Sequence, residues 1–415
     1  MQAVLAIPSS KTLQRLGRGA EFLKQEVAGV PLLERVLATA GRAGVDSILV
    51  IWPDDVKPAI LRAFAESSSL GNGARVEKLS WTNAFDPTGD DWASIAGLLE
   101  GQFLWLPWNW VTHKRALAAL PPSSIRPATW ERPVLLKRDT VLHDGPCRVT
   151  AGPLTDGVSV TSPATIPAAE RFLVANSGKP TDGIYSNFNR LLCRPFVRLF
   201  AHTPTTPNQL TLAGLMVAIL GALVFARGSY VNYVTGALLF FVSGLFDEMD
   251  GMIARIKFRE SAFGTWFEGL VDNVTYLAVF VGIIAGLHRE YGSWAWKWGA
   301  ALIVGCVLSV AVIGMQRKLA TSRDRPHEYA GRMNQLMEAD SSNFVSTIVR
   351  QVHIFVKKGV LVHYLLLFTL LGLLHMFLWL AAVGSNLTWI IALYFTRRFF
   401  SRPPLETTGK HIQTA

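Results

Sequence analysis

Apolar residues follow two different patterns along the chain, and the pattern changes near residue 180. Before that point, short apolar runs such as 3–7 (AVLAI) and 47–51 (SILVI) alternate with a helical pattern that ends near Gly41. Such alternation indicates a parallel sheet with crossover helices. From residue 207 to 397 the apolar runs are long, each near the ~20 residues that a helix needs to cross a bilayer. The sequence therefore predicts an α/β cytoplasmic head, residues 1–178, and an all-α membrane domain, residues 207–415.

Six membrane-spanning helices are predicted in the second part of the chain. Lysines and arginines cluster at alternate ends of these helices, and cytoplasmic loops are the ones enriched in such residues. Both termini are therefore predicted to lie in the cytoplasm, in a multi-pass protein of the cytoplasmic (inner) membrane. A polar cytoplasmic insert is predicted at 316–358, with Arg323, Arg325, Arg332 and Arg350. The predicted spans are 208–227, 231–253, 266–287, 295–316, 359–380 and 381–397.

An amphipathic helix is predicted between the two parts, within residues 179–206. Arg190, Arg194 and Arg198 repeat every four residues from Ile184 to Phe200, opposite an apolar face. This pattern is typical of a helix that lies in the membrane interface. Two interpretations of the arginines remain open: they face lipid headgroups, or they bind a phosphate of the substrate.

Carboxylates gather where the second predicted span ends and the third begins. Acids inside a membrane are rare and mark functional sites. Each of two sets of residues has the spacing of one helix face, and two antiparallel helices would turn the sets toward each other. Converging oxygen ligands suit hard cations such as Mg²⁺, Mn²⁺ or Ca²⁺. The first set is Asp247, Asp250, Gly251, Ala254 and Arg255, and the second is Gly264, Glu268 and Asp272.

These eight residues resemble the signature of the CDP-alcohol phosphotransferases, D-x2-D-G-x2-A-R-x8-G-x3-D-x3-D, with every spacing kept. One position differs, because Glu268 stands where the family has aspartate. Its extra methylene moves the carboxylate by roughly 1 Å, which retunes the geometry around a metal. Residues 206–211 (TPNQLT) also resemble the start of the family's membrane domain, which implies that Asn208 and Thr211 bind the CDP-alcohol.

The resemblance implies a metal-dependent transferase whose donor is a CDP-alcohol and whose acceptor is a second alcohol. Asp272 would take the proton from the acceptor hydroxyl, CMP would leave, and the three arginines would bind a phosphate of the acceptor. A homodimer among membrane lipids is also implied. Two Mg²⁺ (or Mn²⁺) ions would be held by Asp247, Asp250, Glu268 and Asp272, and the donor would bind along Gly251, Ala254, Arg255 and Gly264.

The head resembles the sugar-phosphate nucleotidyltransferases over roughly its first half, through AVLAIPSSK and AGVPLLERVLATAGRAGVDSILVI. Those enzymes wrap a triphosphate with a glycine-rich loop, whereas this chain has Pro8, Ser9 and Ser10 there, and no aspartate follows the predicted strand at Phe103. The head is therefore predicted to have lost catalysis. The alternative is that Asp90 and Asp91, or Asp144, bind a metal.

The combination of the two parts is similar to bifunctional enzymes that join an inositol-1-phosphate cytidylyltransferase to a membrane domain forming di-myo-inositol phosphate. The predicted function is transfer of a phospho-alcohol group, of phosphatidyl type, from a CDP-alcohol to an acceptor hydroxyl. Two alternatives remain: a di-inositol-phosphate-type synthase that uses CDP-inositol, and a catalytically degenerate membrane scaffold.

Charge and cysteine content narrow the classes of function. The net charge of +10 is explained by lysines and arginines beside lipid headgroups, and nucleic-acid binding is not favoured because these residues flank the spans. The cysteines, Cys147, Cys193 and Cys306, match no metal spacing and no disulfide framework. The chain opens on a strand pattern without the features of a signal peptide, so the head is expected to stay in the cytoplasm.

Overall fold

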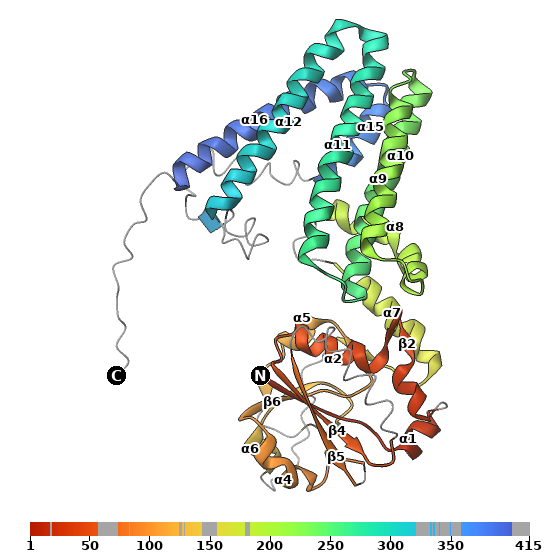
Figure 1. Ribbon diagram of the computed structural model, residues 1–415, viewed down its shortest axis with the longest axis vertical. Coiled ribbons are helices and arrows are strands. Elements are labelled where there is room, and N and C mark those ends of the chain that lie inside the picture. Colours follow the sequence, from red (N-terminus) through yellow and green to blue (C-terminus); the bar gives the residue numbers. More distant parts are fainter. Residues whose placement is uncertain are drawn as a thin grey trace. The chain divides into compact units, whose positions relative to one another are not determined.

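The computed structural model divides into two compact units, in which two helices are shared (Figure 1). The first unit contains residues 1–180, 191–207 and 249–261, and the second contains 181–190, 208–248 and 262–415. The shared helices are α8 (Ile184–Ala201) and α10 (Tyr230–Ile256). The structure describes residues 1–16, 19–56, 74–82, 84–123, 127, 129–142, 156–178, 183–320, 333, 335–336, 340, 349 and 358–400.

The first unit is built on a six-stranded sheet in the order β5-β4-β1-β6-β9-β8. The strand β1 (Gln2–Ala6) is central and pairs in parallel with both β4 and β6, as the alternating sequence pattern predicts. One edge departs from that pattern, because β9 runs antiparallel to β6. The other strands are β4 (Ser47–Pro53), β5 (Arg75–Trp81), β6 (Gln102–Trp105), β8 (Pro122–Ser123) and β9 (Val134–Lys137).

Both faces of the central strands of this sheet are buried. Side chains alternate between the faces along a strand, and so Leu5 joins a cluster with Val36 of α2, whereas Val4 joins a cluster with Trp92 of α4. Trp105 is 4% exposed and belongs to the second cluster, which places it in the core. The short elements around the sheet are α1 (Ser10–Arg15), η1 (Gly19–Lys24), β2 (Glu26–Val27), β3 (Val30–Pro31), α2 (Leu32–Arg42), α4 (Asp91–Ile95), η3 (Ala96–Leu98), β7 (Trp110–Thr112), α5 (Lys114–Ala118), α6 (Arg138–Leu142), β10 (Gly157–Ser159), η4 (Pro163–Thr165) and α7 (Ile166–Ala175).

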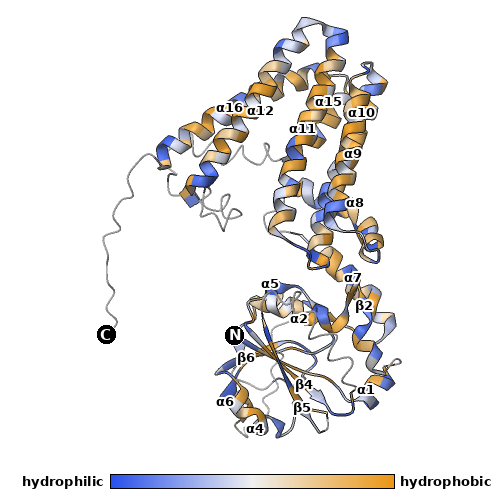
Figure 2. Ribbon diagram, in the orientation of Figure 1, coloured by the Kyte–Doolittle hydropathy of each residue, from blue (hydrophilic) through white to orange (hydrophobic). Residues whose placement is uncertain are grey.

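The second unit is helical, and long apolar stretches run along its helices (Figure 2). Within the described residues, four helices are long and apolar enough to cross a membrane: Pro207–Phe225, Ala262–Tyr291, Ser293–Leu319 and Leu374–Phe399. The predicted second span corresponds to α10, which is not one of these four, and the predicted fifth span contains only a shorter apolar helix, Val360–Leu370. A multi-pass membrane part is thus supported, but the count of six spans is not confirmed. The helices are α9 (Pro207–Phe225), α11 (Ala262–Tyr291), α12 (Ser293–Ala320), α15 (Lys358–Leu370) and α16 (Leu374–Phe400).

The predicted boundary between the last two spans, at residues 380 and 381, is wrong. The chain turns ten residues earlier, between the end of α15 at Leu370 and the start of α16 at Leu374. Gly372 lies in this turn with φ of 71°, a left-handed conformation that glycine adopts without steric cost. The predicted insert at 316–358, with its four arginines, lies largely outside the described residues.

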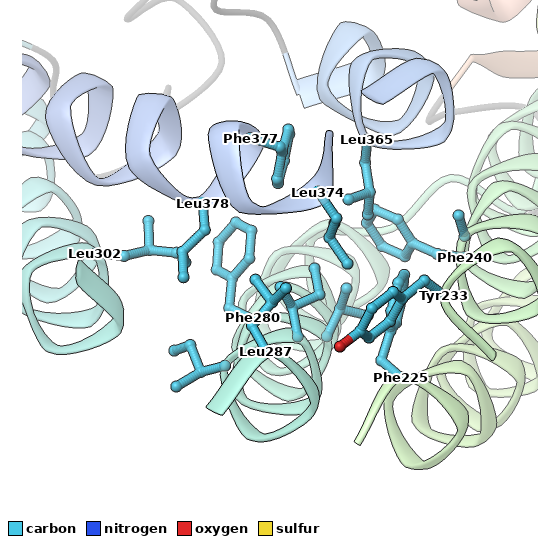
Figure 3. Packing of buried hydrophobic residues seen from close by; sticks show 14 of the residues in the cluster. Phe225, Tyr233, Phe240, Phe280, Leu287, Leu302, Leu365, Leu374, Phe377 and Leu378 are labelled. Carbon is cyan, nitrogen blue, oxygen red and sulfur yellow. The ribbon is translucent and has the colours of Figure 1, made fainter. Parts of the chain in front are cut away.

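The helices of the second unit pack around one apolar core (Figure 3), which includes Phe225, Phe240, Phe280 and Phe377. Close packing depends on glycine where α9 meets α11, because a side chain at Gly282 would overlap the backbone of Ala222. Small residues of this kind let helix backbones approach closely in a membrane. This core holds α9, α10 and α11 together.

Candidate functional site

A cavity with both polar and apolar lining residues lies in the second unit, between α8, α9, α10, α11 and α15. Its volume is about 60 Å³, which holds several water molecules or ions. Three residues singled out from the sequence line it: Thr211, Asp247 and Asp272. The structure therefore brings one acid from each of the two predicted sets to the same cavity.

Helical spacing explains how these side chains meet. Ser243 and Asp247 are four residues apart on α10, and Asp272 and Tyr276 are four apart on α11, so that each pair shares one helix face; all four line the cavity. Gly214 lets α9 lie close to α10, because a Cβ at Gly214 would be only 3.0 Å from the Cβ of Phe246. The polar residues that line the cavity offer oxygen atoms or an amide nitrogen. None of the described lining residues has a thiol or an imidazole.

The other two predicted acids lie elsewhere. Asp250 follows Asp247 by one turn and is 3% exposed, and Glu268 precedes Asp272 by one turn and is half-buried. Neither belongs to the set that lines the cavity. Among the residues that the structure describes, no group of three or more histidine, cysteine, aspartate or glutamate side chains is placed to hold a metal ion. The oxygen donors at the cavity fit a hard cation in chemical type, but ligation by all four acids stays a prediction.

Asn189 of α8 adds a feature that the sequence reasoning missed. Its side chain is 4% exposed, and its Oδ1 is buried without a hydrogen-bond partner in the described part of the chain. Leaving such a group unpaired costs about 1–3 kcal/mol, and an unsatisfied buried polar atom in a native structure needs an explanation. Because Asn189 lines the cavity together with Asp247 and Asp272, a ligand that donates a hydrogen bond or carries positive charge would satisfy this oxygen.

Glu248 is the second residue that the sequence reasoning missed, and it pairs with Arg190. The Nε of Arg190 donates to Oε2 of Glu248 at 3.2 Å, and the Oγ of Ser186 donates to Oε1. Both charged side chains are largely buried, with 9% and 17% exposed. Arg190 thus lies inside the unit and not at a lipid-facing surface, whereas Arg194 is exposed and Arg198 half-buried. Binding of an acceptor phosphate by these arginines stays a prediction.

The predicted donor-binding residues of α10 lie in the first unit. A Cβ at Gly251 would be 3.2 Å from Nη1 of Arg255. The side chain of Arg255 therefore lies along α10 and covers the helix face at Gly251. The Nε of Arg255 also donates to the carbonyl oxygen of Ser177. Ala254 is half-buried on the same helix, and Gly264 and Asn208 are half-buried on α11 and α9.

The loop that follows β1 in the head is closed by a carboxylate of the chain itself. The backbone N–H and the Oγ of Ser10 both donate to Oδ2 of Asp55, at 2.9 and 2.6 Å. In a nucleotidyltransferase this loop faces the triphosphate. Here the negatively charged carboxylate of Asp55 would repel such a ligand. Of the alternative metal-binding acids, Asp91 accepts the N–H of Asp86 at 2.8 Å, and Asp144 lies outside the described residues. The loss of catalysis in the head stays a prediction, with the Asp55 contact in its favour.

Comparison with known proteins bears on the membrane part. Residues 204–390 match the family model described as CDP-alcohol phosphatidyltransferase, which confirms the predicted family for this part of the chain. The chain is 24% identical to the bifunctional IPC transferase and DIPP synthase of Aquifex aeolicus over 239 residues, 57% of this chain and 50% of that protein. It is 35% identical to the archaetidylinositol phosphate synthase of Methanothermobacter thermautotrophicus over 98 residues, 23% of this chain and 49% of the relative.

A third relative is covered over more of its length. The phosphatidylinositol phosphate synthase of Streptomyces avermitilis is 27% identical over 230 residues, 54% of this chain and 85% of that protein. The first two relatives, by contrast, are spanned over about half of their length.

Proposed function

Because residues 204–390 belong to the CDP-alcohol phosphatidyltransferase family, we propose that the chain transfers a phospho-alcohol group from a CDP-alcohol to an acceptor hydroxyl and releases CMP. The observation that carries the proposal is the shared cavity of Asp247 and Asp272. The donor is of phosphatidyl type and the acceptor is a polyol or its phosphate. Two relatives are named as synthases of an archaetidylinositol phosphate and a phosphatidylinositol phosphate, which favours an inositol phosphate as acceptor.

Asp272 is the proposed general base. Its carboxylate is half-buried and lines the cavity, where it takes the proton of the acceptor hydroxyl as that oxygen attacks the phosphorus of the donor. The bond from phosphorus to the CMP oxygen breaks, and the phosphodiester to the acceptor forms. Asp247, Asp250, Glu268 and Asp272 would hold Mg²⁺ or Mn²⁺, which supplies positive charge against the phosphates when bound.

The remaining residues position the donor. Gly251 and Ala254 add no bulky side chain to their face of α10, and Arg255 would pair with a phosphate oxygen of the bound donor. Thr211 offers a hydroxyl on the cavity wall. The acyl chains of a lipid donor fit the outer surface of α9, where Met216 and Leu223 are exposed. The distribution of lysines and arginines favours a cytoplasmic location for both termini, and the protein is proposed to act as a homodimer.

The test is CMP release by the purified full-length chain with Mg²⁺ and inositol phosphate. CDP-diacylglycerol and CDP-inositol are offered separately. Asp272→Asn should lower turnover by about 10²–10⁴-fold, the usual contribution of a general base. Asp139→Asn is the matched control, because Asp139 is exposed in the head and has no role in the proposed site.

Each result separates the candidate functions. Release with the lipid donor that Asp272→Asn abolishes supports the proposal. Release with CDP-inositol alone favours the solute synthase, the candidate suggested by the match to the bifunctional relative. If neither donor releases CMP, the transferase proposal is wrong and the scaffold alternative stands.

A further inference from the structure

The turn between α10 and α11 is held by side chains of the head. This turn, residues 257–261, is called the motif turn below, because it joins the helix of Asp247 and Asp250 to the helix of Glu268 and Asp272. It belongs to the first unit, together with the sheet and α2. Its contacts with the head are therefore contacts within one compact unit.

Arg35 makes the first of these contacts. It lies on α2 and is 1% exposed. Its Nη1 donates to the carbonyl oxygen of Ile256 at 2.9 Å, while Nε and Nη2 donate to the carbonyl oxygen of Val27 at 3.0 and 2.7 Å. One buried guanidinium thus joins the end of β2 to the last residue of α10. Hydrogen bonds from a charged group are stronger than those between neutral groups.

Arg42 makes the second contact, two turns further along the same face of α2. Its Nη2 donates to the carbonyl oxygen of Phe258 at 2.9 Å, and its Nη1 pairs with the carboxylate of Glu260. The guanidinium carbon atoms of Arg35 and Arg42 lie 5.2 and 5.0 Å from the centroid of the Phe258 ring. Both distances are within the range of a cation–π interaction, and so Phe258 is held by two arginines.

The backbone of the motif turn needs such support. The N–H of Arg259 donates to the carbonyl oxygen of Ala254 at 2.8 Å, and Phe258 has φ of 57°. Helices often end in this way, but glycine usually occupies the left-handed position. The conformation is unfavourable for a residue with a Cβ, and it persists only where the surroundings enforce it.

Lys257 ties the same turn to the segment after α8. Its side chain is buried, and its Nζ donates to the carbonyl oxygens of Phe200, Thr203 and Thr205. The motif turn is therefore fixed from two sides, by α2 of the head and by the segment that leads into α9.

We propose that the head is a positioning domain, in which Arg35 and Arg42 fix the motif turn and thereby the spacing of the two acid-bearing helices. This inference rests on the proposed function for its catalytic consequence. It gives the head a role that requires no nucleotide, consistent with the closure of its β1 loop by Asp55. Arg35 and Arg42 are positioning residues, since both act through the turn.

The first experiment needs neither substrate nor metal. Hydrogen exchange of the full-length chain is followed by mass spectrometry over peptides that cover residues 256–268. Arg42→Gln and Glu260→Gln should each speed exchange there by about 10-fold or more, the equivalent of one lost hydrogen bond to a charged group. Arg75→Gln is the matched control, because Arg75 is in the same domain, pairs with Glu77 and has a side chain 80% exposed.

The second experiment measures the consequence for the site. With the same three variants, Mn²⁺ affinity is measured by electron paramagnetic resonance and turnover by CMP release. Arg42→Gln and Glu260→Gln should each lower both the Mn²⁺ affinity and kcat. Within each variant the two quantities should fall by the same factor, and KM for the CDP-alcohol should be unchanged. The double variant should be no worse than Arg42→Gln alone, because the ion pair that Glu260→Gln breaks is one of the contacts that Arg42→Gln already removes.

Two outcomes would overturn parts of this account separately. Exchange over 256–268 that is the same in Arg42→Gln as in Arg75→Gln would refute the positioning role, whatever the activity. A wild-type chain that releases no CMP, but whose turn loosens in Arg42→Gln, would refute the proposed function and leave the positioning role intact.

Discussion

The buried pair of Arg190 and Glu248 provides a quantitative test of the cavity wall. Arg190→Gln removes the cation while Glu248 stays with a side chain only 17% exposed. Removing one partner of a buried pair costs about 3–5 kcal/mol. Here Ser186 still donates to the carboxylate, and a hydrogen bond to a charged group offsets about 1.5 kcal/mol or more. We therefore expect a loss of roughly 2–3 kcal/mol in the free energy of unfolding.

The measurement is a thermal unfolding scan of the purified chain in detergent. For a unit of this size each kcal/mol shifts the midpoint by about 2–4 °C, so Arg190→Gln should lower it by about 4–12 °C. Arg194→Gln, in the same helix but exposed, should change the free energy of unfolding by no more than about 0.5 kcal/mol. Glu248→Gln and the double variant complete a double-mutant cycle, in which the double variant should be more stable than the sum of the single effects predicts.

Two results would refute this reasoning. Additive effects in the cycle would mean that the two side chains do not stabilise each other. An unchanged midpoint in Arg190→Gln, together with a raised KM for the phosphorylated acceptor, would mean that Arg190 binds the substrate and does not stabilise the fold through Glu248.

Three further predictions concern other parts of the chain. Asn189→Leu removes the unpaired oxygen from the cavity, so the midpoint should not fall while kcat/KM drops by about 10-fold or more, measured by CMP release. Gly282→Val forces a side chain against Ala222 and should destabilise the chain by about 1–3 kcal/mol or more. In the same thermal scan the control Gly269→Ala should leave the midpoint unchanged, because a Cβ at Gly269 meets nothing within 4 Å. Burial and the neighbouring Arg115 and Lys114 lower the pKa of His113 below 6.5, so the unfolded state binds the proton more readily and stability should fall as the pH drops through 6.5.

The His113 prediction has a specific control. The neutral ring accepts the N–H of Arg115 through Nδ1 at 3.2 Å and so caps α5. His113→Asn keeps an acceptor at the cap but cannot titrate, and its midpoint should depend less on pH between 5 and 7. An equal pH dependence in both proteins would assign the effect to other groups.

Helical periodicity was sufficient to predict part of the site. The spacing of Asp247 and Asp272 places each on a defined face of its helix, and the structure brings both faces to one cavity. Asn189 and Glu248 could not be found in the same way, because their roles depend on which face of α8 meets α10. That choice is made by packing between segments almost 60 residues apart, and no local pattern reports it.

Local patterns also located the central strands of the head but not every boundary. The runs at β1 and β4 are apolar and flanked by polar residues, so their positions follow from the sequence. The turn at Gly372 lies inside one continuous apolar stretch. Average hydropathy therefore contains no signal for it, and only the glycine marks the place.

The three-part composition of the first unit has a consequence for biosynthesis. Its last stretch, 249–261, follows α9 and most of α10 in the chain. On the ribosome, the hydrogen bond from Arg35 to Ile256 cannot form until both of these helices have been synthesised. Domains generally fold from the N-terminus as they emerge from the ribosome. The first unit, however, stays incomplete while the membrane insertion machinery already acts on the chain. A nascent chain that stops before residue 256 would leave Arg35 without this acceptor, and quality-control proteases would meet an unfinished head.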